Sequence, residues 1–201
     1  MFNQSNASTR EKILIVSARL FSERGYSKVT TREIANATGI NVASIYYHFS
    51  SKEDILDCLF RFYTEERIKQ QPDLNELMQL AETGHPHEVL MKTEFHFNDE
   101  IRDTLDQILV TGAREICADP ESERFINDNI FQHISDVLRP LLQRLTDLGK
   151  IKPLDIDTFL RIVSYYCFSA AALNKSSFRH NVTEYQKGMA QLFSLIEPLE
   201  P

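Results

Sequence analysis

Three helix-start signatures in the first quarter of the chain divide it into short helices. In each, a hydroxyl side chain stands three residues before a glutamate: Ser8 and Glu11, Thr30 and Glu33, Ser50 and Glu53. In such a capping box, the two side chains bind each other's backbone amides at the start of a helix. The N-terminal segment is therefore predicted to hold several short, closely connected helices.

A tight turn is predicted between the second and third signatures. Gly39 can adopt the positive φ that ends a helix, and Asn41 can cap the helix that follows. Two helices joined by a turn of about three residues form a helix-turn-helix.

The second helix of this pair has two different faces. At 100° per residue, one side carries apolar groups and is predicted to pack on neighbouring helices: Val42, Ile45, Tyr46 and Phe49. The other side carries small and polar groups and is the candidate DNA-reading face: Ala43, Ser44, Tyr47 and His48. A helix this short needs tertiary packing for stability, which leaves the second face free for a major groove.

The segment from Thr31 to Leu56 resembles the signature of the tetracycline-repressor (TetR) family of transcriptional regulators. The resemblance extends back through Ala18, Leu20-Phe21 and Gly25-Tyr26, and so covers roughly residues 9 to 56. It implies an all-helical homodimer that represses transcription until a small molecule binds the C-terminal domain. It also implies operator contacts by Thr31, Arg32, Val42, Ala43, Ser44, Tyr46, Tyr47, His48 and Lys52. Ala43 stands where many relatives have glycine, a difference that affects how closely the backbone can approach the bases.

The composition of the reading face limits how it can recognise a sequence. Its centre has no arginine, glutamine or asparagine, the side chains that bind guanine or adenine through two hydrogen bonds. Arg32, near the start of the preceding helix, is the best candidate for such a contact. Thr31 and Lys52 lie at predicted helix N-termini, where phosphate binding is favoured.

Charge is distributed unevenly along the chain. Residues 1 to 52 contain seven Lys or Arg and three Asp or Glu, a net charge of +4. Because the whole chain has a net charge of −7, residues 53 to 201 carry −11. A basic segment in an acidic protein is the electrostatic pattern expected of a DNA-binding surface.

Length and composition predict an all-α protein of two parts. Residues 1 to 52 form the DNA-binding domain, with residues 1 to 8 as a disordered arm, and residues 53 to 201 form the effector-binding and dimerisation domain. The N-terminal residues lack the apolar run of a signal peptide, and the longest uncharged stretch has thirteen residues, too few to span a membrane. A soluble, cytoplasmic protein is expected. Three widely separated cysteines fit a reducing compartment: Cys58, Cys117 and Cys167.

Helix boundaries beyond residue 52 follow from prolines and capping residues. The fourth helix is predicted to end near Gln71, before Pro72, and to act as the lever between ligand and DNA-reading helices. The segment His85-Pro86-His87 indicates a loop or helix joint. The later helices are predicted to run from Asn98 to Cys117, from Asp119-Pro120 to Gly149 with a kink at Pro140, from Asp155 or Asp157 to Ser176, and from Val182 to Ile196.

The segment from Ile162 to Asn174 is apolar on most of its circumference and must be covered on all sides. We therefore expect it to form a four-helix seam with the last helix across a twofold axis. Burial inside one subunit is the alternative. The residues predicted at this dimer interface are Tyr165, Phe168, Ala172, Met189, Leu192, Phe193 and Ile196.

An effector pocket is predicted in the C-terminal part, lined by apolar side chains with a few polar groups. The candidate residues are Met91, Phe95, Phe97, Leu109, Phe125, Phe131, His133 and Tyr166. Ordinary core packing is the alternative for each of them. The many aromatic side chains favour an apolar or aromatic effector.

The sequence gives no support for an enzyme. His85, His87 and His96 lack a metal-binding spacing, and no nucleophile elbow, phosphate loop or dinucleotide motif is present. No metal and no cofactor are expected. The alternative to a DNA-binding regulator is a helical protein-interaction adaptor without specific DNA binding, whose basic N-terminus is incidental. A DNA-binding test would separate the two, because an adaptor would not show the steep salt dependence set by neutralised phosphates.

The expected mechanism is a shift between two populated states. A dimer would hold its two reading helices about 34 Å apart, one turn of DNA, and so fit a palindromic operator. Effector binding would favour a state with a different separation.

Overall fold

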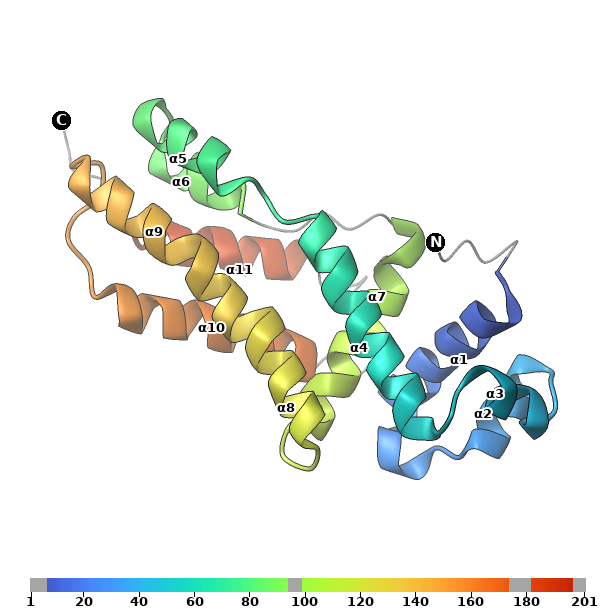
Figure 1. Ribbon diagram of the computed structural model, residues 1–201. Coiled ribbons are helices and arrows are strands. Elements are labelled where there is room, and N and C mark those ends of the chain that lie inside the picture. Colours follow the sequence, from blue (N-terminus) through green and yellow to red (C-terminus); the bar gives the residue numbers. More distant parts are fainter. Residues whose placement is uncertain (1–6, 94–98, 174–181, 197–201) are drawn as a thin grey trace.

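The computed structural model describes residues 7–93, 99–173 and 182–196, and the fold is all-α, as predicted. The elements in chain order are α1 (Thr9–Arg24), the short 3-10 turn η1 (Tyr26–Lys28), α2 (Thr31–Thr38), α3 (Val42–His48), α4 (Lys52–Lys69), α5 (Leu74–Thr83), α6 (Pro86–Met91), α7 (Asp99–Glu115), α8 (Pro120–Ile126), the π-helical segment η2 (Asn127–Gln132), α9 (His133–Asp147), α10 (Ile156–Leu173) and α11 (Val182–Ser194). Figure 1 shows α1, α2 and α3 together at one end, with α4 crossing from them to the larger group of helices.

The first two capping boxes form as predicted. At α1, the Glu11 amide donates to Ser8 Oγ at 3.3 Å, and the Ser8 amide donates to the Glu11 carboxylate at 2.8 Å. At α2, Thr30 and Glu33 make the same reciprocal pair, also at 3.3 and 2.8 Å. Local sequence alone therefore fixes where these two helices start. Of the predicted arm, residues 1 to 6 lie outside the described residues.

The third predicted box is wrong by one residue. Ser51, not Ser50, caps α4, and its hydroxyl accepts from the amide of Asp54 at 3.2 Å. The Ser50 amide donates to the Asp54 carboxylate at 2.8 Å. Two adjacent serines followed by two adjacent acids allow either register, and the structure selects the later one.

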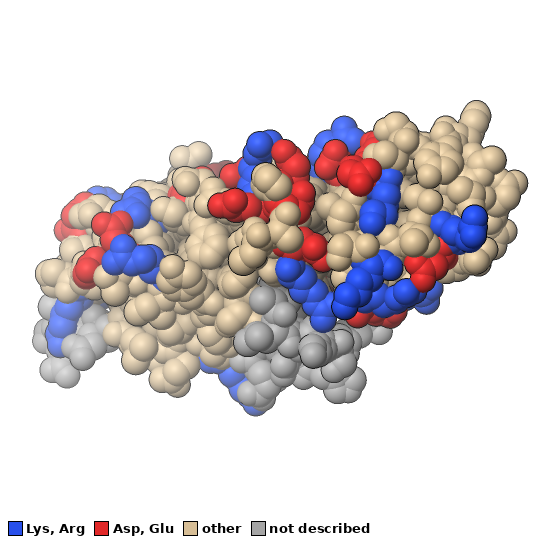
Figure 2. All heavy atoms as spheres, turned by 90° about the horizontal axis from the view of Figure 1, so that it is seen from below, with Lys and Arg blue, Asp and Glu red and all other residues tan. Residues whose placement is uncertain are grey.

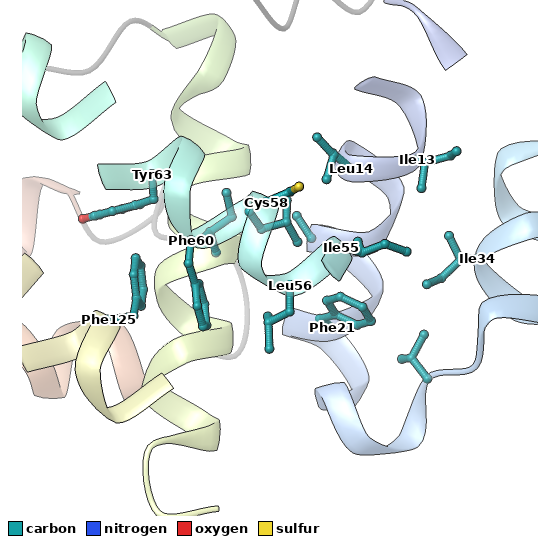
Figure 3. Packing of buried hydrophobic residues seen from close by; sticks show 14 of the residues in the cluster. Ile13, Leu14, Phe21, Ile34, Ile55, Leu56, Cys58, Phe60, Tyr63 and Phe125 are labelled. Carbon is teal, nitrogen blue, oxygen red and sulfur yellow. The ribbon is translucent and has the colours of Figure 1, made fainter. Parts of the chain in front are cut away.

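One hydrophobic core joins the first three helices to α4 and α7. It contains fully buried side chains from each of these elements: Ile13 and Phe21, Ile34, Ile45, Ile55 and Leu59, and Leu105 and Ile108. In Figure 3, labelled side chains of α1, α2 and α4 lie in this shared interior. Full burial of each large apolar side chain contributes about 1.5–3 kcal/mol. Because α2 and α3 are too short to be stable alone, this core holds them in place.

A second core lies among α5, α6, α9, α10 and α11. Its most deeply buried members are Ala81, Val89, Leu90, Leu141, Leu142, Leu145, Ile151, Val163 and Phe193. Ile134 and Cys167 pack against both cores and so lie at their junction. This part of the chain is the larger helical domain that follows the helix-turn-helix.

Several later boundaries agree with the sequence. Asp119 caps α8 by accepting from the Ser122 amide at 2.7 Å, and Asp155 caps α10 by accepting from the Thr158 amide at 3.1 Å. The joint at His85 to His87 is present, with His85 capping α6. The predicted cap Asn98 and the predicted end Ser176 lie outside the described residues.

Two features of the later helices differ from the predictions. The helix α5 was not predicted, although Asp73 caps it by accepting from the Asn75 amide at 2.8 Å. The predicted long helix from Pro120 is interrupted by the π-helical segment η2, whereas Pro140 lies inside α9 without ending it. The helix therefore changes its hydrogen-bond pattern at η2, and it continues through Pro140, which has no backbone N–H to donate.

Within the described parts of the chain, no helix combines the length and apolar character needed to cross a bilayer.

Candidate nucleic-acid interface

The turn between α2 and α3 has the predicted geometry. Gly39 adopts a left-handed conformation, with φ of 76°, and its amide donates to carbonyl groups at the end of α2. Asn41 then caps α3, with its Oδ1 accepting from the Ser44 amide at 2.7 Å. The two short helices are thereby held in a helix-turn-helix.

The inward face of α3 is formed by Ile45, which is fully buried, and by Phe49 directly after the helix. The outward face carries Tyr47, which is 85% exposed, together with the exposed Ala43. Ser44 and His48 are half-buried beside them, and the rings of Tyr47 and His48 meet edge to face at 5.0 Å. The predicted reading face is therefore on the surface.

Tyr46 was predicted to pack inward, and this is wrong. Its side chain is 54% exposed, and its hydroxyl lies 3.4 Å from Thr31 Oγ1 at the start of α2. Val42 is half-buried and packs against the core. Tyr46 therefore lies on the outward side of α3 beside Thr31, and Arg32, the next residue of α2, is also exposed.

Lys52 is placed differently from the expectation that it contacts a phosphate. Its Nζ donates to the carbonyl oxygens of Tyr26 and Val29, each at 3.0 Å. The same ammonium lies 4.1 Å from the centre of the Tyr26 ring, which is a cation–π contact. In this structure Lys52 ties α4 to the segment between α1 and α2.

The first helices also carry basic groups on their surface. In Figure 2, Lys and Arg side chains are spread over the end of the molecule built from α1, α2 and α3. Arg24 forms an ion pair with Glu33 at 2.7 Å. Hydrogen bonds from Thr30, together with Arg24, hold the pKa of Glu33 at about 2. Glu33 is therefore ionised at neutral pH and offsets only part of the positive charge.

The residues predicted to line an effector pocket are divided between the two cores. Leu109, Phe125 and Phe131 belong to or pack on the first core, and Met91 and Tyr166 pack on the second. Phe125 is buried and stacks on Phe60 with ring centres 4.1 Å apart. Phe95 and Phe97 lie outside the described residues. The described members of the predicted set therefore do not line one common cavity.

A buried polar cluster lies at the junction of α4, η2 and α9. The Arg67 guanidinium donates from Nε to Asn129 Oδ1 at 2.8 Å, and its Nη1 lies 2.7 Å from His133 Nδ1. All three residues are at least nine-tenths buried. Burial and the charge of Arg67 lower the pKa of His133 to about 4, so its ring is neutral at pH 7.

Sequence reasoning named His133 but missed Arg67 and Asn129. One signal was available for Arg67, because it lies four residues after Tyr63 and thus continues the apolar stripe of α4. Asn129 and His133 are likewise four residues apart. The sequence does not show that the side of α4 with Arg67 contacts the side of η2 and α9 with Asn129 and His133.

A surface groove of about 590 Å³ runs between α4 and α8. Its walls carry carboxylates from both helices, including Asp57, whose pKa is raised by burial and by the nearby carboxylate of Glu121. Among the described residues, no group of three or more His, Cys, Asp or Glu side chains is arranged to hold a metal ion.

The residues predicted at a dimer interface fall into two groups. Met189, Phe193 and Ile196 are buried in this chain's own second core, and Leu192 packs against it, so the prediction that they line a seam between subunits is not supported by their burial. Burial inside one subunit, the alternative, accounts for them. Tyr165 is 61% exposed and Phe168 is half-buried next to Phe131. The side chain of Ala172 lies outside the described ones.

Comparison with known proteins identifies the same helix-turn-helix region. The family model described as "Bacterial regulatory proteins, tetR family" matches residues 13–59, which span α1 to the first half of α4. The HTH-type transcriptional repressor KstR2 of Mycobacterium tuberculosis is 26% identical over 164 residues, which cover 78% of this chain and 76% of that repressor.

Solved structures show the same fold over nearly the whole chain. PfmR, a TetR family transcriptional regulator from Thermus thermophilus, is 23% identical with a TM-score of 0.65, covering 98% of this chain and 100% of that one. A transcriptional regulator from Saccharomonospora viridis, solved in complex with choline, is 20% identical with a TM-score of 0.63, covering 96% and 98%. Residues 13–59 therefore belong to the TetR family of bacterial regulatory proteins, and the described chain has the fold of solved TetR-family transcriptional regulators.

Proposed function

We propose that this protein is a repressor that binds a palindromic operator as a homodimer. We propose that a small apolar or aromatic effector releases it from the operator. The observation that carries the proposal is the surface of α3, where Tyr47 is 85% exposed while Ile45 behind it is fully buried. The buried side of α3 fixes the helix, and the Tyr47 ring on its other side points into solvent, where it does not stabilise the fold. In a DNA major groove this ring would have a binding partner.

The proposed operator surface combines the start of α2 with the outward side of α3. Arg32 can form two hydrogen bonds with guanine, and Ala43 can contact a thymine methyl group. Tyr47 and His48 are positioned for phosphate or sugar contacts, with Thr31 and Tyr46 beside them. Ser44 already donates its hydroxyl to Asn41 Oδ1 at 3.0 Å, so it would meet DNA as an acceptor. Lys52 would support this surface from behind.

The proposed dimer uses the exposed side of α10. Ile162 and Tyr165 are 48% and 61% exposed and lie three residues apart on the same helix face. A twofold axis through this face would place the same apolar patch of a second subunit against it. The two α3 helices would then lie about 34 Å apart on DNA.

The proposed effector site lies in residues 53–201. Choline in the Saccharomonospora viridis regulator is an example of a small organic molecule held by this fold. Here, Phe125 supplies aromatic surface against α4, where it stacks on Phe60, while Phe131 packs on the first core and Tyr166 on the second. Because α4 begins directly after the reading helix and ends beside η2 and α9, a ligand that moves its C-terminal end would also move α3.

The test is a gel shift of the purified protein on DNA upstream of its own gene and its neighbours. We expect a saturable shift that resists unrelated competitor DNA and weakens steeply with salt. No specific shift on these fragments, followed by failure to enrich any site from genomic DNA, would contradict the proposal and favour a protein-interaction adaptor.

A further inference from the structure

The buried cluster of Arg67, Asn129 and His133 contains one permanent charge and two neutral partners. Asn129 is fixed with its oxygen toward Arg67, because its Nδ2 donates to the carbonyl of Phe125 at 2.9 Å. His133 must accept at Nδ1, since a guanidinium can only donate. A ring that is already accepting from a cation resists a second proton, in agreement with its lowered pKa.

No carboxylate lies within ion-pair distance of Arg67 in the described part of the chain. Asp128 and Asp136 attract it through space, but both are exposed and neither binds it directly. Arg67 itself is only 8% exposed. A buried cation with neutral partners alone is costly, and proteins usually pair such a charge with an anion.

The guanidinium has capacity for such an anion. Of its five N–H groups, one on Nε and one on Nη1 are used by Asn129 and His133. The remaining N–H groups have no acceptor among the described residues. A planar guanidinium with free donors on adjacent nitrogens matches the two oxygens of a carboxylate.

The surroundings of the cluster are aromatic. Tyr63, one turn before Arg67 on α4, is buried and meets Phe125 edge to face at 5.2 Å. Phe125, whose carbonyl holds Asn129, therefore lies next to the cluster, and Phe131 of η2 contacts the rings of Tyr165 and Phe168 on α10. A ligand at Arg67 would thus meet a positive group at one end and apolar rings around it.

We infer that the effector of this protein is an organic acid whose carboxylate binds Arg67 and whose apolar body packs among the aromatic side chains of α4, η2 and α10. This inference rests on the proposed function, since it names the chemical class of the effector. A bound carboxylate would pair with Arg67 of α4, where α4 meets η2 and α9. A shift of α4 caused by this binding would be passed to the reading helix α3, because α4 follows α3 directly in the chain.

The experiment compares acids with their own neutral amides on the wild-type protein: octanoate with octanamide, and phenylacetate with phenylacetamide, at equal ionic strength. We expect at least one acid to raise the melting temperature and to release the protein from its operator, and to bind about tenfold or more tightly than its amide. Because this comparison uses the unaltered protein, it does not depend on whether any variant folds.

Variants then locate the site. Arg67→Met should abolish the preference for acid over amide, and Arg67→Lys should weaken it by about tenfold, since lysine offers a point charge in place of two aligned donors. Arg124→Met is the matched control, because it removes an exposed arginine of α8 and should leave the preference intact. Helical circular dichroism and operator binding without ligand verify that each variant folds.

Equal binding of acid and amide by the wild-type protein would overturn the inference, and so would a preference that survives in a folded Arg67→Met variant. These outcomes are separate from failure of the proposed function, which is loss of specific operator binding in the absence of any ligand. A protein that binds its operator but ignores all these acids would keep the proposed function and lose only the inference.

Discussion

At the scale of single residues, the side chains that matter for function are those whose placement does not help the fold. Tyr47 is 85% exposed on a seven-residue helix, and Arg67 is a charge buried beside neutral groups. Neither arrangement stabilises the chain by itself. We propose a partner outside the chain for each of them: DNA for Tyr47, and an anion for Arg67.

Replacing Tyr47 by alanine should weaken operator binding about tenfold or more while changing the free energy of unfolding by less than about 0.5 kcal/mol, because an exposed side chain contributes little to stability. Titration of labelled operator and chemical denaturation measure the two effects. Tyr47→Phe separates the hydroxyl from the ring, and Ile68→Ala, at another exposed large side chain on α4, is the control. An operator affinity unchanged by Tyr47→Ala would remove this residue from the reading face.

His133 predicts how stability depends on pH. Its pKa is about 4 in the folded protein and 6.5 in the unfolded chain, so the unfolded state takes up the proton first as the pH falls. The free energy of unfolding should therefore decrease from about pH 6.5 toward pH 4, by roughly 2–3 kcal/mol. Carboxylates with lowered pKa, such as Glu33 at about 2, lose their contribution only below pH 4.5.

The variant His133→Gln keeps an oxygen that can accept from Arg67 but cannot titrate. Its stability should be flat between pH 6.5 and 4.5, apart from the opposite and smaller effect of Asp57, whose raised pKa favours the folded state at low pH. Chemical denaturation at several pH values measures the free energy of unfolding, with His87→Gln as the control. A slope in His133→Gln equal to that of the wild type would show that another group is responsible.

At the scale of elements, the sequence predicts what is local and misses what depends on docking. The capping pair Thr30 and Glu33 needs only residues three apart, and it forms as predicted. Tyr46 is 54% exposed and lies beside Thr31 of α2, although a helical wheel of α3 groups it with the apolar side chains. A wheel of one helix does not show its neighbours, and for this reason it also hides the cluster around Arg67, whose members are more than sixty residues apart in sequence.

The end of α7 provides a second connection to the DNA-binding helices besides α4. Glu115 Oε1 accepts from the Tyr26 amide at 3.0 Å, and Arg114 donates to the carbonyl of Ser22 near the end of α1. Removing the first contact by Glu115→Ala should lower the free energy of unfolding by about 1 kcal/mol, the usual value of one such hydrogen bond.

Hydrogen exchange at the Tyr26 amide is the direct readout for this contact. Exchange should speed up in Glu115→Ala, because the amide loses its acceptor. It should not change in Glu121→Ala, an exposed glutamate of α8. Unchanged exchange in Glu115→Ala would mean that the link does not hold the turn after α1.

At the scale of the whole molecule, α10 has an exposed apolar surface among the described residues. The sequence predicts that α10 needs cover on all sides, and the structure covers only part of it, leaving Ile162 and Tyr165 exposed. The last helix does not complete this surface, because Met189 and Phe193 are already buried in the chain's own core. Of the residues predicted at the dimer interface, Met189 and Phe193 are thus buried within this chain, and the proposed partner surface consists of Ile162 and Tyr165.

A charge on the exposed face of α10 should separate the proposed dimer. Ile162→Asp should convert the protein to a monomer in sedimentation velocity while leaving its helical content unchanged, because the side chain is 48% exposed and is not needed for the core. Operator affinity should fall with it, since a monomer holds only one half-site. Ile68→Asp, at an exposed isoleucine of α4, introduces the same charge elsewhere and should leave both properties intact. If Ile162→Asp stays dimeric, the interface lies on another surface, and the separation of the two α3 helices must be set by helices other than α10.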